Sequence, residues 1–170
     1  MADELFCLRQ LAEKQREWNR PLCALKSDVL KAFDTIDLRY VWPTLIASGM
    51  PRPVARAVFR ELVERRVQFS LCGSEISSGW TSIGDPLSAL LFTARLNRLL
   101  APLVANWAKR GLGVQLDPYL HGPLRTLSLL RFADDIIMVA SCLRDLKQMT
   151  EELRVALRKA GLLLSPEKCK

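Results

Sequence analysis

The sequence predicts an α+β fold built on a split β-α-β sheet with an antiparallel hairpin at its centre. Apolar segments of strand length occupy residues 22–29, two runs within 127–140, and residues 162–165. Between them, apolar residues recur at helical spacing over 85–107 and 143–160. The resulting order is strand, helix, two strands, helix, strand. It places the first strand beside the hairpin.

The segments outside this unit are predicted to be mostly helical. Helical spacing of apolar residues from Leu5 indicates an amphipathic helix that Pro21 stops. An insertion at 38–84 begins with a helix that Gly49 ends. A second helix over 51–66 and a hairpin with strands at 67–72 and 75–83 complete the insertion.

Punctuating residues set the bounds of the later elements. Asp85 is predicted to cap the helix over 85–107, with Pro86 in its first turn. Residues 111–123 are a loop or an irregular ribbon, and Gly161 stops the last helix.

Two adjacent carboxylates stand at the centre of the predicted hairpin. Ala133, Asp134 and Asp135 separate its apolar runs, 127–132 and 136–140. Adjacent aspartates repel each other, and no lysine stands near them in sequence to neutralise them. The simplest interpretation is a turn, where aspartate is common. The alternative is a divalent-cation site.

Asp28 adds a third carboxylate at the end of the first strand. Because the sheet order places this strand beside the hairpin, we expect Asp28 to approach Asp134 and Asp135. Three carboxylates with few bases nearby suit two divalent cations, Mg²⁺ by default, about 3.5–4 Å apart and clamping a phosphoryl transfer. The competing interpretation is that Asp28 or Asp34 caps the helix that follows.

Length and composition indicate one globular domain. The chain has 170 residues, of which 49% are hydrophobic and 25% charged, which suffices for one core. Five scattered cysteines without a Cys-x-x-Cys pair favour a reducing, intracellular compartment over a disulfide framework or a zinc site. No apolar run reaches the length of a membrane span and the N-terminus lacks a signal-peptide pattern, so no membrane association is expected.

The charge balance favours a polyanionic partner. The formal net charge is +7. Arg52, Arg56 and Arg60 recur every four residues along the helix over 51–66. This basic stripe is either a solvated face or a face that contacts nucleic-acid phosphates.

Four short motifs follow one another along the chain: Asp28-Val-Leu-Lys-Ala-Phe-Asp34, Gly84-Asp-Pro-Leu-Ser-Ala-Leu-Leu-Phe92, Phe132-Ala-Asp-Asp135 and Gly161-Leu-Leu-Leu-Ser-Pro-Glu-Lys168. They occur in the order of reverse transcriptase motifs A to D. The chain resembles the palm and part of the fingers of a non-LTR (LINE-type) retrotransposon reverse transcriptase. This implies a right-hand polymerase palm with a ferredoxin-like antiparallel sheet, two Mg²⁺ ions with Mn²⁺ as a substitute, and a nuclear location. The implied partners are an RNA template, a DNA primer and dNTPs.

The resemblance also implies roles for individual residues. Asp28 and Asp134 match the metal-binding aspartates, and Asp135 is the second aspartate of its motif. Lys168 matches the motif D lysine that protonates pyrophosphate, although a solvated terminal lysine is the alternative. The implied nucleotide-binding positions are Val29, Phe33, Gly84, Asp85 and Pro86. Phe33 matches the bulky residue that rejects a ribose 2′-OH, and its alternative is an ordinary core phenylalanine.

The chain departs from the family pattern just before motif B. Ser82 and Ile83 stand where the family usually has a basic residue and glutamine, and isoleucine offers no hydrogen bond to a nucleotide. We expect one domain over 1–170, a palm with partial fingers at 38–84, with the other finger residues upstream and the thumb downstream of this chain. We therefore expect a retained metal site and impaired polymerisation by the isolated chain.

Two other functions compete with a polymerase palm. One is a non-catalytic nucleic-acid-binding relic of a retroelement, in which the basic surface acts and the aspartates are vestigial. The other is a nucleotide cyclase, which shares the split β-α-β sheet and paired aspartates. The cyclase is disfavoured because Phe33 and residues 84–92 match template-dependent enzymes.

Overall fold

The computed structural model describes residues 2–30, 38–64, 67–71, 74–78, 86–116 and 126–165. The chain divides into two compact units, one of residues 1–30 and 98–170, and the other of residues 31–97. Helix α4 (Pro86–Lys109) contributes residues to both units. The expectation of one domain with partial fingers at 38–84 stays a prediction.

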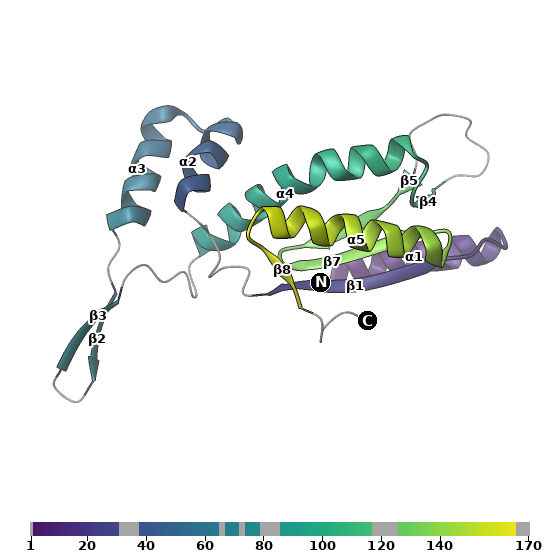
Figure 1. Cartoon of the computed structure of the whole chain (residues 1–170), viewed down its shortest axis with the longest axis horizontal. Coiled ribbons are helices and arrows are strands. Elements are labelled where there is room, and N and C mark those ends of the chain that lie inside the picture. The colour runs from purple at the N-terminus through teal and green to yellow at the C-terminus, as the bar shows by residue number, and fades with distance from the viewer. Residues whose placement is uncertain are drawn as a thin grey trace. The chain divides into compact units, whose positions relative to one another are not determined.

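The first unit is built on a four-stranded antiparallel sheet (Figure 1). Its strands, in spatial order, are β6 (Leu129–Phe132), β7 (Asp135–Ala140), β1 (Cys23–Leu30) and β8 (Leu163–Leu164). Helix α5 (Leu143–Lys159) connects β7 to β8. This is the strand order of a split β-α-β unit, so the predicted α+β fold is confirmed.

Helices cover both faces of the sheet, which explains why β7 is apolar at five successive positions. Residues Ile136 to Ala140 are all buried. Because neighbouring side chains in a strand point to opposite faces, Ile137 and Val139 pack with Leu11 of α1 (Ala2–Glu17), while Ile136 and Met138 face the other side. Figure 1 shows α5 and α1 on opposite sides of the sheet.

The register between β1 and β7 determines which polar residues meet. Cys23 lies opposite Ala140 at one end of the pairing, and Asp28 lies opposite Asp135 at the other. Past this pairing, the Ser165 N–H donates to the Asp28 carbonyl oxygen at 2.9 Å. Asp28 therefore lies on an inner strand of the sheet, with its backbone held from both sides.

A short ribbon packs beside this sheet, with its first strand inside the predicted loop or irregular ribbon over 111–123 and its second strand just after that segment. Strand β4 (Val114–Gln115) pairs with β5 (Thr126–Leu127). Gly113 precedes the ribbon with φ of +125°, and a Cβ at this position would lie 2.7 Å from the Leu127 carbonyl oxygen. The position therefore requires glycine. The Gly113 carbonyl oxygen accepts a hydrogen bond from Ser141 Oγ at 3.0 Å.

A buried hydrogen bond ties α4 to α5 in the same unit. Trp107 is fully buried, and its indole Nε1–H donates to Glu152 Oε2 at 2.8 Å. Arg110 pairs with the same carboxylate at 2.9 Å. Burial alone would raise the pKa of Glu152, but hydrogen bonds from Trp107, Arg110 and Gln148 lower it below its usual range.

The second unit contains two helices and a hairpin, as the sequence predicts. Helix α2 (Leu38–Ala47) precedes Gly49, whose φ is +78°, and α3 (Arg52–Glu64) follows. The rings of Trp42 and Phe59 meet edge to face at 6.0 Å. The hairpin pairs β2 (Val67–Leu71) with β3 (Ser74–Ser78). None of the described helices has the length and apolar composition needed to cross a membrane.

Candidate active site

The turn of the central hairpin is two residues long, one fewer than the sequence suggested. Ala133 and Asp134 form the turn, and Asp135 is the first residue of β7. Ala133 has φ of +51°, a conformation that costs a non-glycine residue roughly 1–2 kcal/mol. Because Asp134 lies in the turn and Asp135 in the strand, the two adjacent carboxylates have different surroundings.

Asp28 and Asp134 come together as predicted. The Asp28 side chain is buried, with 7% of the residue exposed, and it lies in hydrogen-bonding contact with the Asp134 carboxyl group. Burial raises the pKa of Asp134; its backbone hydrogen bond opposes this, whereas the carboxylates of Asp28 and Asp135 raise the pKa further. The pair is therefore electrostatically unfavourable when both groups are ionised without a cation.

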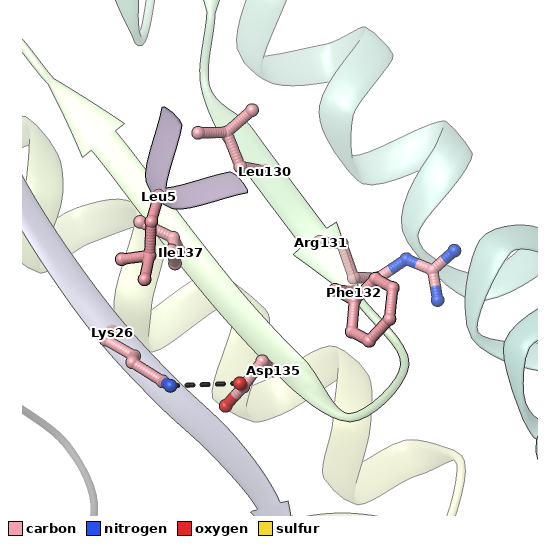
Figure 2. Close-up of a pocket in the computed structure, with 7 residues that line it drawn as sticks. All are labelled: Leu5, Lys26, Leu130, Arg131, Phe132, Asp135 and Ile137. Atoms are coloured by element: carbon pink, nitrogen blue, oxygen red, sulfur yellow. Dashed lines mark hydrogen bonds and ion pairs between the residues drawn. The ribbon is translucent and has the colours of Figure 1, made fainter. Parts of the chain in front are cut away.

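Asp135 has a different partner. Its Oδ2 lies 2.9 Å from Lys26 Nζ, and Figure 2 shows this pair bridging the neighbouring strands β1 and β7. No lysine stands near the two aspartates in sequence, but strand pairing brings Lys26 from a distant part of the chain to Asp135. The available signal was its position two residues before Asp28, on the same face of β1.

Arg131 does not take part in this ion pair. Figure 2 shows its guanidinium directed away from Asp135, and its Nη1 donates to the Ala133 carbonyl oxygen at 3.5 Å. Partial burial lowers the pKa of Arg131 from its usual value.

The three aspartates expected to form one cluster therefore divide into the Asp28–Asp134 carboxylate pair and the ion pair of Asp135 with Lys26. Among the described residues, no group of three or more Asp, Glu, His or Cys side chains is arranged to hold a metal ion. Two carboxylates are nevertheless a suitable donor set for Mg²⁺, which commonly takes one or two protein carboxylates together with substrate phosphates and water. The Asp28–Asp134 pair fits such an ion.

The other predicted site residues fall into two groups. Val29 has a buried side chain, and its N–H donates to the Asp134 carbonyl oxygen at 3.2 Å. Pro86 opens α4 as predicted. The three arginines of the basic stripe lie exposed on α3: Arg52, Arg56 and Arg60. Four predicted residues lie outside the described part of the chain: Phe33, Gly84, Asp85 and Lys168.

The sheet order and the placement of the aspartates agree with a polymerase palm: one carboxylate comes from the first strand, and its partner from the turn of the central hairpin. A comparison with protein families identifies the group. The model for reverse transcriptase (RNA-dependent DNA polymerase) matches residues 2–170. The chain belongs to the reverse transcriptase family.

Two relatives are Pol polyproteins of R2 retrotransposable elements, which supports the predicted resemblance to a retrotransposon reverse transcriptase. The retrovirus-related Pol polyprotein from type-1 retrotransposable element R2 of Nasonia vitripennis is 28% identical over 146 residues. The polyprotein from type-2 retrotransposable element R2DM of Drosophila melanogaster is 28% identical over 153 residues. Each alignment covers 84% of this chain and 13% of the relative, so the chain spans only a small part of these proteins.

Solved structures confirm the fold. Apo telomerase from Candida tropicalis superposes with a TM-score of 0.71 at 13% identity, covering 99% of this chain and 31% of that chain. A form of the same enzyme truncated from the C-terminal domain gives a TM-score of 0.68 at 14% identity, with 99% and 34% coverage. At this level of identity the likeness concerns the fold alone.

Proposed function

We propose that this chain is the palm of an RNA-directed DNA polymerase, which transfers nucleotides from dNTPs to a primer 3′-OH under the direction of an RNA template. The observation that supports this most directly is the contact between Asp28 and Asp134. Apolar residues would pack better at the turn of a palm hairpin than two carboxylates held together, so packing does not explain this pair. Their repulsion is relieved when a divalent cation binds between them.

Asp28 and Asp134 would hold the cation, with Mg²⁺ preferred and Mn²⁺ as a substitute. Two such ions, when bound, lower the barrier to attack by the primer hydroxyl and stabilise the leaving pyrophosphate. The chain supplies the positioning: pairing with β7 fixes Asp28 on one side, the Ser165 N–H fixes its backbone on the other, and the Val29 N–H fixes the backbone of Asp134. This geometry keeps the two carboxylates in place without the ion.

The remaining assignments follow from the motif matches. We propose that Phe33, Val29, Gly84, Asp85 and Pro86 surround the incoming dNTP and that Lys168 donates a proton to pyrophosphate. Ser82 replaces the usual basic residue, and Ile83 removes the hydrogen bond that the usual glutamine offers to a nucleotide, so the isolated chain should polymerise poorly. A nuclear location is proposed on the same basis.

The first test is a calorimetric Mn²⁺ titration of the wild type and Asp134→Asn. We expect binding by the wild type and at least a tenfold loss in the variant, because one of two carboxylate ligands is removed. Absence of binding by both proteins would favour a non-catalytic relic. Primer extension on an RNA template should be weak at ordinary dNTP concentrations, and efficient extension would refute the proposed impairment.

Nucleic-acid binding without catalysis is the second candidate, because all three arginines of the basic stripe are exposed on one helix. We expect the triple change to glutamine at Arg52, Arg56 and Arg60 to weaken binding of an RNA–DNA duplex. The slope of log K against log salt should fall by about 2–3, or roughly 0.7–0.9 for each lost phosphate contact.

The matched control removes three exposed positive charges from α5, where Arg144, Lys147 and Arg158 are changed to glutamine. An equal loss of binding in the control would show that total charge, and not the α3 stripe, accounts for the effect.

A further inference from the structure

The ion pair between Lys26 and Asp135 lies directly beside the carboxylate pair of the candidate active site. Lys26 lies opposite Ile137 and Asp28 lies opposite Asp135 in the pairing of β1 with β7. Lys26 therefore reaches Asp135 diagonally, on the same face of the sheet as Asp28. The Nζ–Oδ2 distance is 2.9 Å.

The surroundings favour a defined geometry for this pair. The Asp135 side chain is 19% exposed and that of Lys26 is 45% exposed. Both line a small cavity of about 50 Å³ with Leu5, Phe132 and Ile137 (Figure 2). Apolar neighbours reduce solvent screening, so the ion pair holds the carboxylate more firmly than a fully exposed pair would.

The ion pair also changes the charge presented to a cation. Asp28, Asp134 and Asp135 together contribute three negative charges when ionised. Lys26 compensates the charge of Asp135, which leaves the Asp28–Asp134 pair with a charge of about −2 to match one divalent ion. This division agrees with the absence of a three-carboxylate group among the described residues.

We propose that Lys26 is a positioning residue of the metal site, which retains Asp135 on its own side of the hairpin so that Asp28 and Asp134 are the principal protein ligands of the cation. The proposal rests on the proposed function, since it requires that the site bind a divalent ion. It differs from the assignment of all three aspartates as equivalent ligands, because Asp135 becomes a residue that sets local charge and geometry.

The decisive experiment is a Mn²⁺ titration by calorimetry on the full 170-residue chain. Asp134→Asn should lose at least tenfold in affinity, whereas Asp135→Asn should lose clearly less, about threefold, because the charge of Lys26 is then left uncompensated. Lys26→Met should bind Mn²⁺ about threefold to tenfold more tightly, because it leaves an uncompensated negative charge within a Debye length of the ion. Lys26→Arg should restore wild-type affinity.

A matched control separates this local effect from a change in net charge. Lys14→Met removes a lysine that pairs with Glu17 on α1 at 2.7 Å, and its Mn²⁺ affinity should stay within twofold of the wild type. The double variant Lys26→Met/Asp135→Asn should return to near the wild-type affinity, because the charge that Lys26 compensates is then gone.

The outcomes distinguish the two levels of the proposal. If the wild type binds no Mn²⁺, both the proposed function and the role of Lys26 fail. If the wild type binds but Asp135→Asn loses as much affinity as Asp134→Asn, Asp135 is a direct ligand and only the role of Lys26 is overturned. Unchanged Mn²⁺ affinity in a folded Lys26→Met protein also overturns the role of Lys26. Should Lys26→Met fail to fold, the Asp135→Asn result alone decides.

Discussion

Replacing Asp134 with asparagine should stabilise the chain in the absence of metal while removing most of its stabilisation by metal. Asparagine keeps nearly the same shape and removes the charge that repels the buried Asp28 carboxylate. Two unit charges 4 Å apart repel by about 4 kcal/mol at an effective dielectric constant of 20 and by about 1 kcal/mol in water. Asp134 is partly exposed, so the lower value applies. A gain of about 1 kcal/mol corresponds to a rise in Tm of about 2–4 °C for a chain of this size.

The assay is thermal unfolding followed by circular dichroism, first in EDTA and then with Mn²⁺ at ten times its dissociation constant. Ligand linkage should stabilise the wild type by about 1.4 kcal/mol under the second condition, whereas Asp134→Asn, with at least tenfold weaker affinity, should gain about 0.4 kcal/mol or less. The order of the two Tm values should therefore reverse or converge when metal is added.

The pH dependence provides an independent check. Because the folded pKa of Asp134 is raised, the folded state retains this proton more firmly than the unfolded state does. The resulting loss of folding stability in the wild type is absent below pH 3.8, the ordinary pKa of aspartate. It develops as pH rises through the raised pKa of Asp134, and it persists at higher pH. The stability difference between the two proteins should grow over this range.

Asp145→Asn is the matched control, since it makes the same chemical change in the first turn of α5. A carboxylate near a helix N-terminus is favourable, so this variant should lose a few tenths of a kcal/mol. The reasoning would be refuted if Asp134→Asn were less stable than the wild type in EDTA at neutral pH, because the contact with Asp28 would then be stabilising.

Two further predictions concern the framework of the first unit. Gly113→Ala should destabilise the chain by roughly 2 kcal/mol or more, because its Cβ would meet the Leu127 carbonyl oxygen at 2.7 Å with φ at +125°; a denaturant midpoint equal to that of the wild type would contradict this. Glu152→Ala should cost about 2 kcal/mol by leaving the buried Trp107 N–H without its acceptor, with Glu152→Gln as the milder control. This contribution should be lost as pH falls through the lowered pKa of Glu152, and thermal unfolding at pH 7 and pH 3 would show whether it is.

The order of elements was sufficient to predict the sheet and the approach of Asp28 to the hairpin. Strand and helix periodicities differ strongly, and a split β-α-β unit has few ways to arrange its four strands. The sequence could also indicate the position of the turn, since Ala133, Asp134 and Asp135 separate two apolar runs.

The divided carboxylate cluster could not be predicted in the same way. Every β7 residue from Ile136 to Ala140 is apolar and buried, so the strand has no alternation of polar and apolar residues that would fix its register in advance. Without the register, neither the assignment of Asp135 to the strand nor its pairing with Lys26 follows from sequence. The roles of the residues near motif A and motif B that lie outside the described ranges remain predictions.

The pairing of Asp28 with Asp135 means that the length of β7 helps to determine the geometry of the active site. Inserting or deleting one residue between Asp135 and Ala140 would exchange the two faces of β7, so that side chains now packed against α1 would turn toward α5. The same change would move the aspartates relative to Lys26. Homologues with a different number of residues in this strand would need a compensating bulge, and engineered chimaeras should be joined outside it.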